Sequence, residues 1–166
     1  MSEPTTILIV EDEQSMIRIW SEFLAPLKGE VRIAMTIESA IEQMARVPYP
    51  DIVLLDLRLP HSQNAEETLK AINVLKDINP KTVVVVLTGA VDGKLAELAS
   101  QLGADAYANK MECATQVSLL NFIGGALAKR STNPKAPAFE NSLALLEQLH
   151  NLTCPDPIKT SAAHSV

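Results

Sequence analysis

Short, continuous apolar runs recur along this chain and alternate with segments whose apolar residues follow helical spacing. The clearest runs are TILIV at residues 6–10 and TVVVVL at residues 82–87, and both are rich in β-branched residues. Runs without polar alternation are typical of strands that are covered on both faces, as in a parallel sheet. Five strands are predicted in this way, at residues 6–10, 31–34, 52–55, 82–87 and 104–108.

The segments between the runs predict five amphipathic helices. The first carries its apolar stripe on Met16, Trp20, Phe23, Leu24 and Leu27. It is expected to fray near Pro26 and to stop at Gly29. Thr36 is expected to cap the second helix. The later helices are expected between Ile37 and Met44, between Ala65 and Leu75, between Leu95 and Leu102, and from Glu112 to Lys129.

Other breaks in the helical pattern mark where these helices end or lose stability. Asn79-Pro80 is expected to end the third helix and Gly103 the fourth. Gly124 and Gly125 are expected to weaken the fifth, because glycine in a helix interior is unfavourable.

Strands that alternate with helices predict an α/β domain with a doubly wound five-stranded parallel sheet. Right-handed crossovers place helices on both faces, which gives a flavodoxin-like three-layer sandwich. The expected strand order is 2-1-3-4-5, so that strands 1 and 3 are neighbours at the switch point. Ligands of such sheets bind outside the carboxyl ends of the strands near that point.

The predicted domain occupies residues 6–130, after a short tail at residues 1–5. Residues 131–139, STNPKAPAF, are polar and contain prolines, which is typical of a linker. Residues 140–152 predict an extra helix with Leu145, Leu149 and Leu152 on one face. Residues 153–166 are expected to be a disordered tail.

Composition excludes several kinds of partner. The net charge of −6 argues against a nucleic-acid or anionic-membrane surface. No apolar run reaches the ~20 residues that cross a bilayer, and MSEPTT has no secretion signal. Cys113 and Cys154 fit no metal or redox spacing, and a disulfide between them is not expected in a reducing compartment. A cytoplasmic protein is expected.

Polar residues follow four of the predicted strands where each strand ends. Glu11, Asp12 and Glu13 follow the first strand, Asp56 the third, Thr88 the fourth and Lys110 the fifth. Taken alone, the acidic pair and Thr88 could be helix caps and Lys110 a surface lysine. Together, at one edge of a parallel sheet, they favour a site.

Clustered carboxylates repel one another and therefore need a cation or a shared proton. An all-oxygen set suits Mg²⁺. Asp56 would be the nucleophile toward a phosphorus atom, and Lys110 would pair with Asp56 or with a phosphoryl oxygen. Thr88 and the N–H groups of Gly89 and Ala90 would add donors.

The stretches ILIVEDE, PDIVLLDLRLP, VVVLTGA and LGADAYANK carry a specific likeness over roughly residues 6–130. The chain resembles a response-regulator receiver domain of two-component signalling, of the single-domain, chemotaxis-regulator-like kind. The resemblance implies a role for each matching residue. These are Asp56 as phosphoacceptor, Glu11 and Asp12 as metal ligands with the Arg58 backbone carbonyl, Thr88 as switch hydroxyl, Tyr107 as switch aromatic, and Lys110 as charge partner.

The resemblance also implies a function. The chain would accept a phosphoryl group from a histidine kinase or a phosphotransfer protein, with Mg²⁺ or Mn²⁺ bound. It would signal to a downstream protein, or to a second copy, through the face formed by helix 4, strand 5 and helix 5. It would be no enzyme beyond its own phosphotransfer and slow autodephosphorylation.

Three departures from the family pattern lie near this site. Met111 follows Lys110 where the family has a proline in a cis bond, so a trans peptide is expected and the reach of Lys110 stays open. The turn after Pro60 reads HSQNAEE in place of a glycine-containing sequence, and His61 borders the site as a surface imidazole. Arg58 could overhang the phosphoryl group or face solvent.

Other classes of protein remain as alternatives to the switch. A pseudo-receiver that is never phosphorylated would act as an interaction module. A hydrolase of the haloacid dehalogenase type would need a second acid two residues after Asp56, where this chain has Arg58. A flavodoxin would need a phosphate-binding loop after the first strand, and none is present.

Overall fold

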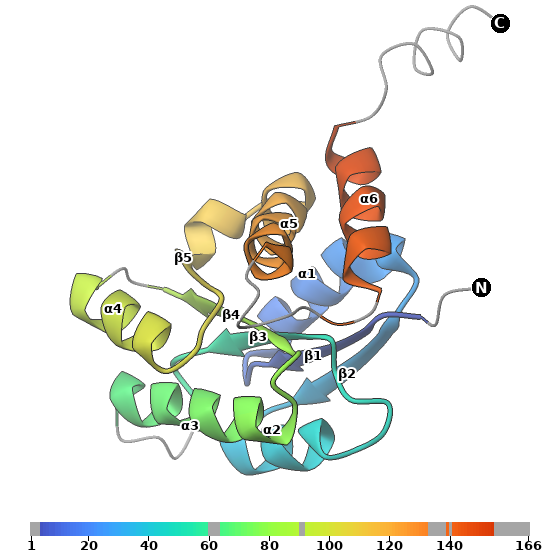
Figure 1. Cartoon of the computed structure of the whole chain (residues 1–166). Helices are drawn as coiled ribbons and strands as arrows, with labels where there is room; N and C mark the ends of the chain where they lie inside the picture. The colour runs from blue at the N-terminus through green and yellow to red at the C-terminus, as the bar shows by residue number, and fades with distance from the viewer. Residues whose placement is uncertain (1–3, 60–63, 90–91, 133–138, 140, 155–166) are drawn as a thin grey trace, which may run out of the picture.

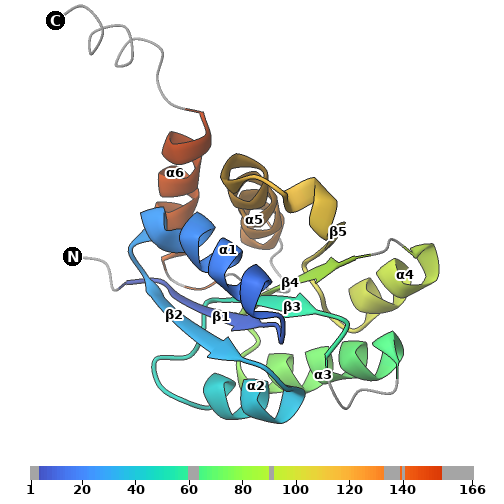
Figure 2. The ribbon, with the colours of Figure 1, turned by 180° about the vertical axis from the view of Figure 1, so that it is seen from behind.

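The computed structural model describes residues 4–59, 64–89, 92–132, 139 and 141–154 of the chain. One five-stranded sheet runs through the molecule, and helices cover both of its faces (Figures 1 and 2). All neighbouring strands are parallel, in the order β2-β1-β3-β4-β5, which confirms the predicted doubly wound topology. The strands are β1 (Thr6–Val10), β2 (Glu30–Ala34), β3 (Ile52–Asp56), β4 (Val83–Thr88) and β5 (Ala106–Asn109).

Two layers of helices complete the sandwich (Figure 1). Helices α1, α5 and α6 lie on one face of the sheet, and α2, α3 and α4 lie on the other. Their bounds are α1 (Gln14–Leu24), α2 (Ile37–Met44), α3 (Ala65–Ile78), α4 (Gly93–Gln101), α5 (Gln116–Ser131) and α6 (Ser142–Thr153). Two 3₁₀ turns, η1 (Ala25–Leu27) and η2 (Lys110–Cys113), follow α1 and β5. None of the helices in the described ranges has the length and apolar character of a membrane span.

The central strands explain why the apolar runs are continuous. In β1, Ile7 and Ile9 pack under α1 and α5, whereas Leu8 and Val10 pack against the α2–α3 layer. All four side chains are fully buried. Burial of an aliphatic side chain contributes roughly 1.5–3 kcal/mol, so both faces of the strand stabilise the sandwich.

The end of α1 differs from the sequence prediction. Helix α1 passes into η1, with Pro26 in its first turn, and the residue with left-handed backbone is Lys28, at φ 54°. Gly29 is required for another reason, because a Cβ atom there would overlap the carbonyl oxygen of Thr5. That close approach lets the N–H of Glu30 donate to Thr5 O at 2.9 Å and start the β1–β2 ladder.

Several predicted helix ends are confirmed. The Thr36 hydroxyl accepts from the Ser39 N–H at 3.1 Å at the start of α2. Gly103 follows α4 with φ 106°, a conformation that favours glycine. The fifth helix, by contrast, begins at Gln116 and not at Glu112, because Thr115 caps it by accepting from the Ser118 N–H. The helix continues unbroken through Gly124 and Gly125.

Helix α6 lies beside α5 and against η1 (Figures 1 and 2). Leu145 and Leu149 are buried in the same cluster as Leu120 and Leu127 of α5. The Gln148 side chain donates to the carbonyl oxygens of residues 26 and 27, each at 3.3 Å. The extra helix is therefore part of the core, not a detached appendage.

Leu152, the third residue of the predicted apolar face of α6, is 38% exposed. Phe139, from the predicted linker, is buried in the core cluster that includes Leu145 and Leu149. Most of that linker and the tail from residue 155 lie outside the described residues, as do residues 1–3.

A buried ionic cluster, which the sequence analysis did not identify, joins α3 and α5 to Asp105, the residue before β5. The Asp105 carboxylate is 2.7 Å from Lys76 Nζ and 3.5 Å from Arg130 Nε. Lys76 also donates to the Thr82 carbonyl at 2.6 Å, and the Val84 N–H donates to Asp105 at 2.8 Å. Burial lowers the pKa of Lys76, and the Asp105 carboxylate opposes that shift.

Candidate functional site

The carboxyl ends of β1 and β3 bring three carboxylates together. Val10 is paired with Leu55, so the residues that follow them, Glu11 and Asp56, emerge side by side. One carboxylate oxygen from each of Glu11, Asp12 and Asp56 lies within 4.8 Å of the others. Glu11 is 1% exposed and Asp56 is 2% exposed, while Asp12 is half-buried. The predicted acidic group is therefore assembled by strand adjacency.

Glu11 is held firmly in this group. Its backbone N–H donates to Ala34 O at 3.0 Å, and its carboxylate accepts from the Glu13 N–H at 3.1 Å. Burial raises the pKa of Glu11 to about 7; the hydrogen bond from Lys110 opposes this shift, and the nearby charge of Asp56 adds to it. A carboxyl group in such a place is stabilised by a positive partner.

Lys110 supplies that partner. Its Nζ is 2.9 Å from Glu11 Oε2 and 3.3 Å from Asp56 Oδ2. It also lies 5.5 Å from the centroid of the buried Trp20 ring, within the range of a cation–π contact. Burial alone would lower the pKa of Lys110, but the hydrogen bond to Glu11 and the charges of Asp56 and Glu11 outweigh it, so the pKa is raised.

The departure at Met111 does not prevent this contact. Among the described residues the cis peptide bond is Val47–Pro48, so Lys110–Met111 is trans, as expected. Lys110 nevertheless reaches both carboxylates. The question that the sequence left open is therefore answered by the geometry of η2, which begins at Lys110.

The predicted switch pair lies at the ends of the next two strands. Thr88 ends β4 and is 4% exposed. Tyr107 lies in β5, paired with Val86 two pairs before the Thr88–Asn109 pair. The Tyr107 hydroxyl is buried, and burial raises its pKa. Thr88 and Tyr107 therefore lie on adjacent strands, β4 and β5.

The donor set fits a hard divalent cation. The three residues offer only carboxylate oxygens, which suit Mg²⁺ or Mn²⁺ and not the softer metals that select sulfur and nitrogen. The Arg58 N–H donates to Asp56 Oδ1 at 3.2 Å, which fixes the carboxylate next to the Arg58 backbone. The Arg58 side chain is exposed.

Some predicted neighbours of the site cannot be placed. Pro60, His61 and the start of the following turn, and the N–H group of Ala90, lie outside the described residues.

Three residues close to Lys110 were missed at the sequence level: Trp20, Asn109 and Glu112. The contact of Trp20 with Lys110 could not be predicted, because Trp20 belongs to an apolar helical stripe and such a stripe has the same sequence pattern with or without a bound cation.

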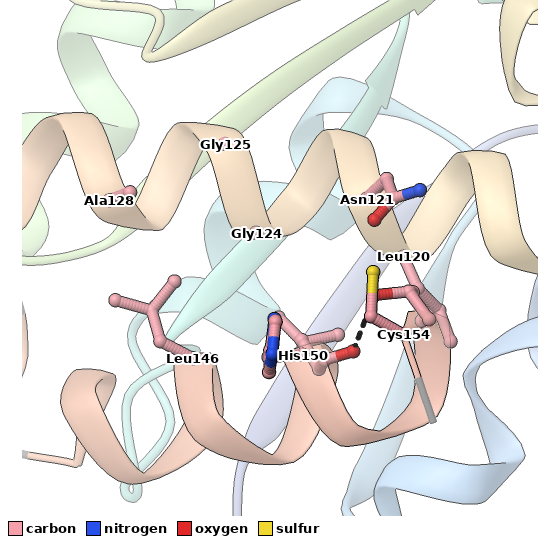
Figure 3. A pocket seen from close by; sticks show the side chains of 10 residues that line it. Leu120, Asn121, Gly124, Gly125, Ala128, Leu146, His150 and Cys154 are labelled. Atoms are coloured by element: carbon pink, nitrogen blue, oxygen red, sulfur yellow. Dashed lines mark hydrogen bonds between the residues drawn. The ribbon is translucent and has the colours of Figure 1, made fainter. Parts of the chain in front are cut away.

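A hollow of about 310 Å³ lies elsewhere, between α5 and α6 (Figure 3). Asn121, Gly124 and Gly125 line it from α5, and Leu146 and His150 line it from α6, with Cys154 at its end. None of the predicted site residues lines this hollow, so it is separate from the acidic group.

Comparison with known proteins agrees with this geometry. The profile described as "Response regulator receiver domain" matches residues 7–121. The regulatory protein LuxO of Vibrio cholerae is 33% identical over 86 residues, which cover 51% of this chain and 18% of LuxO. The transcriptional regulatory protein LnrK of Bacillus subtilis is 31% identical over 102 residues, which cover 60% of this chain and 44% of LnrK. The matched region thus spans less than half of each relative's length.

A solved structure shows the same fold. The CheY-like response regulator receiver domain protein of Methanospirillum hungatei superposes with a TM-score of 0.65 at 22% identity, covering 80% of this chain and all of that one. The family match covers most of the chain and includes every residue of the acidic group, Thr88, Tyr107 and Lys110. The chain belongs to the response regulator receiver domain family of two-component systems.

Proposed function

We propose that this chain is a phosphorylation-dependent switch that accepts a phosphoryl group on Asp56 from a histidine kinase or a phosphotransfer protein. The observation that carries the proposal is the surroundings of Asp56. Its carboxylate is 2% exposed, lies within 4.8 Å of oxygens from two other acids, and is 3.3 Å from Lys110 Nζ. A buried carboxylate without such partners would be costly.

The proposed reaction is an in-line displacement at phosphorus. A carboxylate oxygen of Asp56 forms the new O–P bond as the N–P bond of the donor phosphohistidine breaks, and the leaving imidazole takes up a proton. A divalent cation, held by Glu11, Asp12, Asp56 and the Arg58 carbonyl, would neutralise charge on the phosphoryl oxygens. Lys110, whose Nζ lies 3.3 Å from Asp56 Oδ2, would add a second positive charge beside the phosphoryl group.

The proposed response is a shift between two states of the domain. The Thr88 hydroxyl would donate to a phosphoryl oxygen, and Tyr107 would follow it inward. The surface formed by α4, β5 and α5 would then bind a downstream protein or a second copy. LuxO is named a regulatory protein and LnrK a transcriptional regulatory protein, which supports a signalling role for this chain.

Mass measurement of the intact protein after incubation with Mg²⁺ and acetyl phosphate tests the proposal. The wild type should gain the mass of one phosphoryl group, and Asp56→Asn should gain none. Asp77→Asn, an exposed carboxylate on α3, is the matched control and should gain the same mass as the wild type. A wild type that gains no mass would contradict the proposal and would favour the pseudo-receiver.

A further inference from the structure

We infer that Asn109 is a positioning residue: its side chain holds the η2 turn so that Lys110 reaches Asp56 without a proline at position 111. This inference rests on the proposed function, because Lys110 is given its role there. It concerns a residue that neither the family match nor the sequence motifs single out.

The backbone at Lys110 lies beyond the last pair of the sheet and must be held by other hydrogen bonds. The last pair of the β4–β5 ladder is Thr88 with Asn109, and β5 lies at the edge of the sheet. The ladder therefore ends one residue before Lys110. Lysine has a long side chain with four rotatable bonds, so the position of its Nζ depends strongly on where its backbone lies.

Hydrogen bonds from Asn109 and Glu112 hold the backbone there. The Asn109 Oδ1 atom accepts from the Met111 N–H at 2.9 Å. The Glu112 carboxylate accepts from the Asn109 N–H at 3.4 Å, and together these bonds form a capping box around Lys110. Proline has no N–H group, so the first of these bonds exists only because position 111 is not proline.

The remaining end of the turn is fixed by the core. Cys113 is 2% exposed and belongs to the cluster that α5 covers, whereas Met111 is 77% exposed. The turn is thus held by the core at Cys113 and by the capping box at Asn109. Substitution of the half-buried Asn109 should leave the core untouched, because its partners lie at the surface.

Phosphorylation rates from acetyl phosphate with Mg²⁺ test the inference. Asn109→Ala should slow the phosphorylation of Asp56 roughly five- to tenfold, which corresponds to the loss of one capping interaction. Asn109→Ser retains an acceptor and should restore most of the rate. Thr115→Ala, which removes the similar capping box of α5, is the matched control and should leave the rate unchanged.

Two further measurements distinguish a loss of Lys110 positioning from a general loss of structure at the site. In a Lys110→Met background, Asn109→Ala should cause no additional loss of rate, because Asn109 acts through Lys110. Calorimetric Mg²⁺ affinity should not fall in Asn109→Ala, since the acidic ligands stay in place. An equal loss in both backgrounds, or an unchanged rate in Asn109→Ala, would overturn the inference.

A readout that does not depend on phosphorylation keeps the inference distinct from the proposed function. The ¹H–¹⁵N signal of the Lys110 ammonium group, which is hydrogen-bonded to Glu11, should be observable in wild type, Asn109→Ser and Thr115→Ala. It should be lost in Asn109→Ala. If the wild type takes up no phosphate but this pattern holds, the proposed function fails and the positioning of Lys110 stands; a persistent signal in Asn109→Ala overturns the positioning itself.

Discussion

Lys110 Nζ lies closer to Glu11, at 2.9 Å, than to Asp56, at 3.3 Å. The lysine therefore bridges the two carboxylates that emerge side by side from β1 and β3. This bridge brings a positive charge to the acidic group. A divalent cation at the same oxygens would compete with Lys110 for Glu11 and leave Lys110 free to turn toward a phosphoryl group on Asp56.

The raised pKa of Glu11 predicts a pH dependence of stability. Its pKa of about 7 in the folded protein lies above the ordinary value of 4.5, so the folded state keeps a proton that the unfolded chain releases between these values. The free energy of unfolding should therefore fall as pH rises through this window, by on the order of 3 kcal/mol, and level off above it.

Urea unfolding across pH, in the presence of a chelator, measures this effect. Glu11→Gln has no group to titrate, so its stability should change less across the same window. Equal slopes for the two proteins would show that Glu11 is not the source.

The Asp105 cluster predicts a large loss of stability. Asp105→Asn would leave Lys76 and Arg130 buried beside an uncharged amide, and breaking a buried pair in this way costs about 3–5 kcal/mol. The matched control is Glu30→Gln, which removes the half-exposed partner of Arg32 and should cost about 0–1 kcal/mol. Urea midpoints measure both, and similar losses would argue against a buried network.

The docking of α6 predicts unequal effects of two leucines on the same helix. Leu145→Ala should lower the free energy of unfolding by about 2–5 kcal/mol, because the side chain is 2% exposed in the core. Leu143, at 71% exposure, is the control, and Leu143→Ala should change stability by less than about 0.5 kcal/mol. A small effect of Leu145→Ala would mean that α6 is detached in solution.

The two cysteines predict unequal reactivity. Cys113 is buried, and burial raises the pKa of its thiol to about 11, with a contribution from the Glu112 charge. Cys154 is free and exposed. A thiol reagent in mildly alkaline buffer should modify only Cys154 in the native protein and both cysteines after denaturation, as counted by mass. Rapid modification of Cys113 in the native state would contradict this burial.

Two glycines predict opposite responses to alanine. A Cβ atom at Gly125 would meet no atom within 4 Å, so Gly125→Ala should stabilise the protein by roughly 0.5–1 kcal/mol through helix propensity. At Gly29 the same change would overlap the Thr5 carbonyl and should destabilise the protein. Thermal unfolding of the two variants checks the pair, and a loss of stability in Gly125→Ala would contradict the first expectation.

The sequence by itself determined the alternation of buried strands with helices and the membership of the acidic group. Buried parallel strands such as β3 require continuous apolar runs, and the residue after each run must lie at one edge of the sheet. Asp56 and Glu11 could therefore be placed from their positions alone. Thr88 and Lys110 followed the same rule, whereas Tyr107, which lies within β5, was identified from the family resemblance.

The tertiary structure decided what depends on contacts between distant segments. Gly29 was predicted to end a helix. In the structure glycine is needed there because the backbone of Thr5, just before β1, lies too close for a Cβ atom, and this contact forms only on folding. The pairing of Asp105 with Lys76 and Arg130 joins residues with no shared sequence pattern. Lys110 follows the hydrogen-bonded Asn109 in the chain and lies against the ring of Trp20, ninety residues earlier in the sequence. Local residue spacing can predict the buried face of a helix or the edge of a sheet at which a residue lies. The geometry of an ion pair such as Lys110–Glu11 forms only when folding has brought the two distant segments together.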